Sequence, residues 1–148
     1  IWTDWEPYAT ARDWTLPGGD GPKTVCVQFR DAAGNVVEAK AGITVDTKRP
    51  RLVGTKAVSV RRGAKATLRY KIKDPAPSSG KATVRIVIRK VGGKAVKTVK
   101  LKGRPVGKSL KYRFVCKLRK GRYRYIVSAT DAAGNRQTRV ARNTLRVR

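Results

Sequence analysis

The residue types that support catalysis or metal binding are few in this chain. Histidine is absent, which excludes Ser-His-Asp and Cys-His catalysis and all histidine-based metal sites. Two cysteines, Cys26 and Cys116, cannot build a structural zinc site alone. A carboxylate pair could act as acid and base, but the acidic residues from 47 to 148, Asp74 and Asp131, form no compact constellation in the sequence. We therefore predict that the chain is not an enzyme.

Calcium is the one cofactor that the acidic residues suggest. Extracellular modules often bind Ca²⁺ weakly through carboxylate and carbonyl oxygens. No EF-hand spacing is present, so we expect weak calcium binding at most, and the turn described below accounts for Asp31. The candidate oxygen ligands are Asp4, Glu6, Asp13, Asp20, Asp31 and Asp46.

Charge is distributed unevenly along the chain. Residues 1–46 contain four basic and seven acidic residues, whereas residues 47–148 contain 32 basic and two acidic residues. Such a surface attracts anionic polymers: wall teichoic acid, acidic polysaccharide, lipid headgroups or nucleic acid. The alternative is a solvated outward face, with Lys and Arg filling the polar strand positions. The candidate polyanion-binding residues are Arg61, Arg62, Arg69, Lys71, Lys73, Arg85, Arg89, Lys111, Arg113 and Lys117.

Aromatic residues weigh against nucleic-acid recognition, which needs exposed rings among the basic residues for base stacking. The tyrosines of residues 47–148 mostly take inward strand positions. Near the N-terminus, Trp2, Trp5 and Trp14 could contact a glycan or a partner, or they could pack into a core.

The five residues DAAGN occur twice, at 31–35 and 131–135. Asp at the first position and Gly at the fourth are typical of a type I turn, and a left-handed residue after it completes a common hairpin loop. Residues of alternating polarity precede both copies, so each copy is expected to join two strands. The expected structural turn residues are Asp31, Gly34, Asn35, Asp131, Gly134 and Asn135.

The segments GDGPKTVCVQFRDAAGNV and KGRYRYIVSATDAAGNRQ resemble the last two strands of bacterial immunoglobulin-like or fibronectin type III-like repeats. The resemblance implies an all-β fold of immunoglobulin-like β-sandwich modules in a secreted or cell-surface protein. Such modules are mostly spacers, stalks or adhesive units. Cys26 departs from the pattern, because an aromatic or other outward residue is expected at its position.

The 100-residue spacing of the two turns matches one sandwich module of about 100 residues. We expect residues 1–46 to be the C-terminal part of a first, incomplete module and residues 47–148 to be a complete one. The first part should contain strands near Asp13–Leu16, Lys23–Asp31 and Asn35–Val45. The complete module should contain seven strands, and Tyr123 could form a tyrosine corner. These seven are Arg51–Val60 (with a break at Gly54), Lys65–Lys73, Ala82–Lys90, Lys94–Lys102, Leu110–Leu118, Arg122–Thr130 and Arg136–Val147.

Function follows from the resemblance only in outline. We expect a structural or adhesive extracellular module of a bacterial surface or filament protein, with neighbouring modules or copies of the same protein as partners. The alternative is an accessory module that binds a polyanion or glycan and anchors a larger secreted protein or enzyme to cell wall or matrix. No apolar run approaches the roughly 20 residues of a membrane span. Cys26 and Cys116 take outward and inward phases in different modules, so we expect no bond between them.

Overall fold

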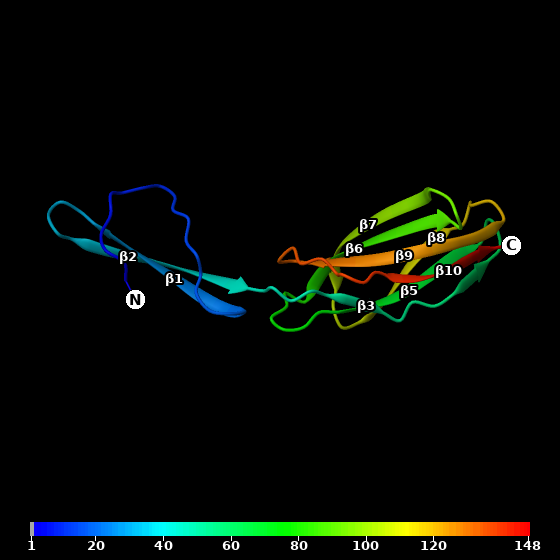
Figure 1. The fold of residues 1–148 in the computed structure, drawn as a ribbon, viewed down its shortest axis with the longest axis horizontal. Coiled ribbons are helices and arrows are strands. Elements are labelled where there is room, and N and C mark those ends of the chain that lie inside the picture. Colours follow the sequence, from blue (N-terminus) through cyan, green and yellow to red (C-terminus); the bar gives the residue numbers. More distant parts are fainter. Residues whose placement is uncertain (1) are drawn as a thin grey trace. The chain divides into compact units, whose positions relative to one another are not determined.

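The computed structural model describes residues 2–148, which form β-strands and no helix. Consequently, no helix in this range is long and apolar enough to cross a membrane. The chain divides into two compact units between Val45 and Asp46. Figure 1 shows the strands of each unit.

The first unit contains one antiparallel ribbon, formed by β1 (Gly21–Arg30) and β2 (Val36–Val45) and closed by the first DAAGN turn. Residues 2–20 contain no strand. The predicted strand at Asp13–Leu16 is therefore wrong. This segment has no neighbouring strand with which to form a ladder, and it runs directly into Pro17 and into Gly18, which has a φ of +77°.

The second unit is built from two sheets. One contains five strands in the order β4-β10-β9-β6-β7, and the other contains three in the order β3-β5-β8. Every pairing within them is antiparallel except that of β4 with β10, which is parallel. The strands are β3 (Arg51–Val53), β4 (Val58–Val60), β5 (Lys65–Lys73), β6 (Lys81–Lys90), β7 (Ala95–Pro105), β8 (Ser109–Val115), β9 (Gly121–Asp131) and β10 (Ala141–Val147).

Of the seven predicted strands, Lys65–Lys73 has the observed bounds, three others differ from β6, β7 and β9 by one to three residues at an end, and the remaining three differ more. The first divides at Gly54, which has a φ of +74°, and its two halves join different sheets. The fifth ends at Val115, because Cys116 turns to donate its N–H to the Ala64 carbonyl at 2.9 Å. The last begins only at Ala141, since the chain before it is held back against the end of β9.

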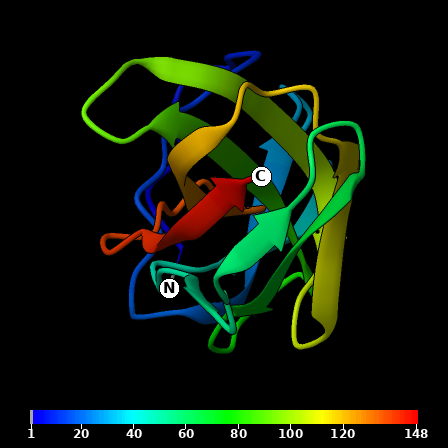
Figure 2. The same ribbon diagram turned by 90° about the vertical axis from the view of Figure 1, so that its right-hand side faces the viewer.

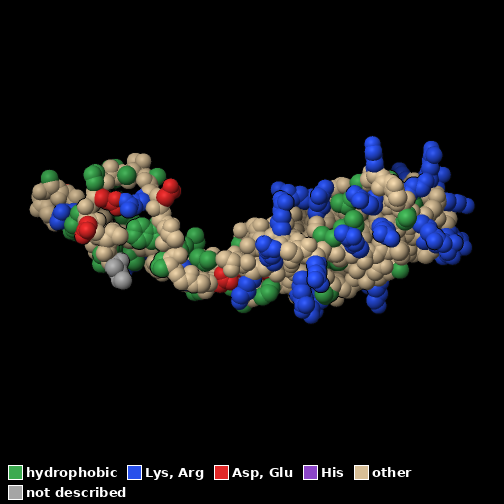
Figure 3. Space-filling model, viewed as in Figure 1, with side chains coloured by type: hydrophobic (Ala, Val, Ile, Leu, Met, Phe, Trp, Pro, Cys, Tyr) green, Lys and Arg blue, Asp and Glu red, His purple; other side chains and the backbone are tan. Residues whose placement is uncertain are grey.

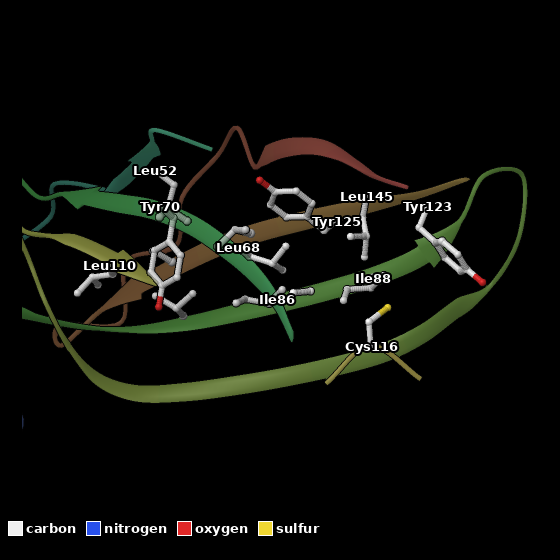
Figure 4. Close-up of a cluster of buried hydrophobic side chains, with 14 of the residues drawn as sticks. Leu52, Leu68, Tyr70, Ile86, Ile88, Leu110, Cys116, Tyr123, Tyr125 and Leu145 are labelled. Atoms are coloured by element: carbon white, nitrogen blue, oxygen red, sulfur yellow. The ribbon is translucent and has the colours of Figure 1, made fainter. Parts of the chain in front are cut away.

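The core lies between the two sheets, and alternating strand residues fill it. In β5, Ala66, Leu68, Tyr70 and Ile72 are all at most 1% exposed, whereas the outward residues between them are mostly charged. Side chains from both sheets meet in this layer (Figure 4). Figure 2 shows the strands of the two sheets in a view turned by 90° from Figure 1. Period-2 alternation therefore places one apolar face of each sheet inside.

The hydroxyl groups of two core tyrosines form hydrogen bonds with the backbone of neighbouring loops. The Tyr123 hydroxyl donates to the Arg119 carbonyl four residues upstream at 2.8 Å, which is the hydrogen bond of a tyrosine corner. The Tyr125 hydroxyl donates to the Lys56 carbonyl at 2.6 Å and accepts the Lys56 N–H at 3.1 Å. The segment between β3 and β4 is thereby held against the five-stranded sheet.

Candidate functional site

Both DAAGN turns close with the same set of hydrogen bonds. In the second turn, Asn135 donates its backbone N–H and its side-chain amide to the Asp131 carboxylate at 2.8 and 2.9 Å. In the first turn, Asn35 makes the same two bonds to Asp31, both at 2.8 Å. These bonds, the side-chain amide first, hold the pKa of Asp31 below its usual value. The repeated sequence therefore encodes a repeated, self-bonded turn.

The second turn also binds the chain that enters the unit. The Asn135 side-chain amide donates to the Asp46 carbonyl at 2.8 Å. This contact brings Asp46 to the end of β9, where Asp131 is buried at 7% exposure. Asp74, which directly follows β5, reaches the same place. One carboxylate oxygen from each of the three side chains lies within 4.8 Å of the other two.

This carboxylate cluster, Asp46, Asp74 and Asp131, contains all the acidic residues of the second unit. Ser78 donates its hydroxyl to Asp74 Oδ2 at 2.6 Å, but Asp74 Oδ1 is buried and has no hydrogen-bond partner. Burial raises the pKa of Asp74, and the charges of Asp131 and Asp46 raise it further, against the effect of the Ser78 hydrogen bond. Carboxylate oxygens are the ligands that Ca²⁺ prefers, so the cluster could hold a hard cation.

The sequence alone does not reveal this cluster, and the prediction that the acidic residues after residue 46 form no compact group is wrong. The three residues come from segments that are far apart in the sequence and meet only at one end of the sandwich. Of the predicted calcium ligands, Asp46 belongs to the cluster, whereas Asp4, Glu6, Asp13, Asp20 and Asp31 belong to the first unit. The signal in the sequence that could have indicated the cluster is that each of its Asp residues stands at the end of a strand.

Seven of the ten predicted polyanion-binding residues lie on the two sheets, and the other three lie in connecting segments. Five of them share the outer face of the three-stranded sheet, where Arg69 lies directly opposite Lys111 and Arg51 lies opposite Lys73. The five are Arg69, Lys71, Lys73, Lys111 and Arg113. Arg85 and Arg89 lie on β6 in the other sheet, while Arg61, Arg62 and Lys117 lie in connecting segments.

The outer face of the five-stranded sheet carries six exposed arginines, which we call the arginine platform. Arg89 lies directly opposite Arg124 between β6 and β9, and Arg122 lies directly opposite Arg146 between β9 and β10. Figure 3 shows groups of Lys and Arg side chains spread over the visible face of the second unit. Sequence alternation places each arginine outward, but only the strand pairing reveals which ones are neighbours. The platform consists of Arg85, Arg89, Arg122, Arg124, Arg142 and Arg146.

In the first unit the aromatic side chains remain accessible. Trp2, Trp5 and Trp14 are 56%, 49% and 50% exposed. The Arg30 guanidinium lies over the Trp5 ring at 4.3 Å from its centroid. The tryptophans therefore do not form a buried core among the described residues of this unit.

Neither cysteine forms a disulfide. Cys116 is fully buried in the sandwich core, whereas Cys26 lies half-buried on β1 of the ribbon. The two thiols belong to different units.

No family model and no curated protein matches the sequence. Among solved structures, a tetra-tandem repeat in the extending region of a large adhesion protein matches with a TM-score of 0.53 and 22% identity, over 86% of this chain and 32% of that chain. The fold is an immunoglobulin-like β-sandwich. The CARDB domain of a Pyrococcus furiosus protein, solved in complex with di-metal ions, has a TM-score of 0.44 and 19% identity, over 68% of this chain and 91% of that domain. This chain spans about a third of the length of the adhesion-protein structure.

Proposed function

We propose that this chain is a structural or adhesive part of a bacterial surface or filament protein, in which immunoglobulin-like modules follow one another outside the cell and carry tension. Residues 1–46 are then the C-terminal part of one module, and residues 47–148 are the next. Their repeated turn supports this arrangement, because the same hydrogen bonds recur one module length along the chain. The likeness to repeats of a large adhesion protein supports the extracellular location.

The parallel pairing of β4 with β10 carries the proposal. Arg62 donates its N–H to the Arg148 carbonyl at 2.9 Å, and Arg148 donates its N–H to the Val60 carbonyl at 2.8 Å. Within the second unit the chain enters at one end of the sandwich and leaves at the other (Figure 1). Tension between these two ends pulls the parallel strands in opposite directions along their length. Their hydrogen bonds are then loaded together in shear rather than broken one after another.

The surface chemistry is consistent with a non-enzymatic role. In residues 2–148 the carboxylate cluster is the group of acidic side chains that come close together, and no thiol or histidine accompanies it. Neighbouring modules and other copies of the same protein are the proposed partners.

Single-molecule pulling on the full chain, held by handles at both ends, tests the proposal. A load-bearing second unit should stay folded as the pulling force rises and should then unfold in one discrete event, seen as a single force peak. The chain length gained should be about 300 Å, given roughly 3.5 Å per extended residue and the length of the folded unit. Gradual extension without a force peak would contradict a load-bearing role.

A further inference from the structure

The arginine platform places like charges side by side without compensation. Directly opposite residues of paired strands have Cβ atoms about 5 Å apart, and like charges at such positions are destabilising. Here Arg89 faces Arg124 and Arg122 faces Arg146, while Arg122 and Arg124 are same-face neighbours on β9. The four guanidinium groups therefore follow a zigzag across three strands.

No acidic side chain of the second unit relieves this repulsion. The ion pairs of Arg12 with Glu6 and of Lys40 with Glu38 both belong to the first unit. All three carboxylates of the second unit are gathered in the cluster at the far end of β9. A row of exposed arginines without carboxylate partners is complementary to an anion that supplies the missing charges from outside.

We infer that the arginine platform binds a linear acidic polysaccharide. Guanidinium groups pair bidentately with carboxylate, sulfate and phosphate groups. Their spacing of about 5–7 Å, which follows from strand separation and the rise between alternate residues, suits charges repeated along an extended chain. Polymer binding and load bearing are independent properties of the second unit.

The same face fits other anionic partners poorly. The partly exposed aromatic rings of residues 46–148, Tyr112 and Phe114, lie on β8 in the other sheet, so the platform itself offers bases no ring on which to stack. A broad sheet face also does not enter a DNA groove, which admits a helix or a two-stranded ribbon. Between the arginines, Val87 and Ile126 are only partly exposed, which leaves no large apolar side chain to insert into a membrane or to anchor a protein interface.

Binding of the full chain to sodium polygalacturonate, a linear uronate polymer, tests the inference by calorimetry over a range of salt concentrations. The platform variant carries R89Q, R122Q, R124Q and R146Q. Its control removes four charges from the opposite sheet, through R51Q, R69Q, K73Q and K111Q. We expect the platform variant to bind about tenfold more weakly than the wild-type chain and with a shallower salt dependence, because counterions are released at fewer contacts. The control should bind within about threefold of the wild-type chain.

The double variant R124Q and R146Q provides a second test that preserves most of the surface. Each substitution removes one member of a like-charge pair, so the melting temperature of the double variant should not fall below that of the wild-type chain. The affinity of the double variant for polygalacturonate should lie between those of the wild-type chain and the platform variant. Equal losses in the platform and control variants would show that only net charge matters. Affinity that does not change with salt, or tighter binding to duplex DNA or to phosphatidylglycerol vesicles, would also overturn the inference.

Discussion

Gly34 and Gly134 occupy the same position of two matching turns, with φ of +91° and +93°. A side chain at this φ is strained even where space is open, as it is beside both glycines. Gly134→Val should therefore lower the free energy of unfolding of the second unit by about 1–3 kcal/mol. Ala133→Val, in the same turn at a residue without positive φ, is the matched control and should change it by less than about 0.5 kcal/mol. Chemical denaturation measures both, and an unchanged stability of Gly134→Val would refute the turn assignment.

The raised pKa of Asp74 makes the stability of the second unit depend on pH. Its pKa in the folded chain lies above its usual value of 3.8, so the folded state holds its proton more tightly than the unfolded state does. Ionisation of Asp74 therefore costs stability, and this cost is absent below pH 3.8 and complete above the folded-state pKa. Asp74→Asn should raise the melting temperature at pH 7 in the presence of a chelator, and the gain should disappear as the pH falls below 3.8.

Ser78→Ala is the control for this residue, because it removes a hydrogen bond that favours ionised Asp74. It should lower the melting temperature at pH 7, the opposite direction from Asp74→Asn. A lower melting temperature for Asp74→Asn at pH 7, or a gain that persists at pH 3, would contradict the electrostatic description of the cluster.

At the scale of elements, the ribbon and the sandwich differ in how completely their strands are paired. β1 and β2 pair only with each other, whereas β9 is paired on both sides, with β6 and with β10. Val27 and Phe29 on β1 remain 43% and 42% exposed, so little apolar burial stabilises the ribbon. In the full chain, amides of β1 and β2 should exchange at least about a hundredfold faster than those of β9.

The edge strand β7 provides the comparison for this measurement, since it also has one free edge but packs against the core through Val99 and Leu101. Its amides should exchange more slowly than those of the ribbon. Equal protection of β1 and β9 would mean that the first unit is as stable as the sandwich, and that residues 1–46 are not the incomplete part of a module.

Local patterns predicted the elements better than their arrangement. Strict alternation gave β5 its observed bounds, because one face of that strand is buried along its whole length. Alternation could not show that the strand predicted at Arg51–Val60 divides between two sheets, since sheet membership depends on partners distant in the sequence. The same reason hid the carboxylate cluster and the direct opposition of Arg122 and Arg146.

At the scale of the whole molecule, the central claim is that the parallel pairing of β4 with β10 makes the second unit resist tension. Arg62 precedes Gly63, which has a φ of +86°, in a turn closed by a 3.0 Å bond from Ala64 N–H to the Arg61 carbonyl. Proline is favoured at the position that Arg62 takes in such a turn. Arg62→Pro should therefore preserve the turn while it removes the hydrogen bond to Arg148.

The most direct measurement compares Arg62→Pro with Arg62→Ala under constant force, with the full chain held at both ends. Arg62→Ala loses the same side chain but keeps the N–H that donates to Arg148. One such bond is worth about 1 kcal/mol, so the Pro variant should survive under load for about a fifth of the Ala variant's lifetime, if the bond breaks in the rate-limiting step. Equal lifetimes of the two variants would contradict the claim that β4 and β10 carry the load.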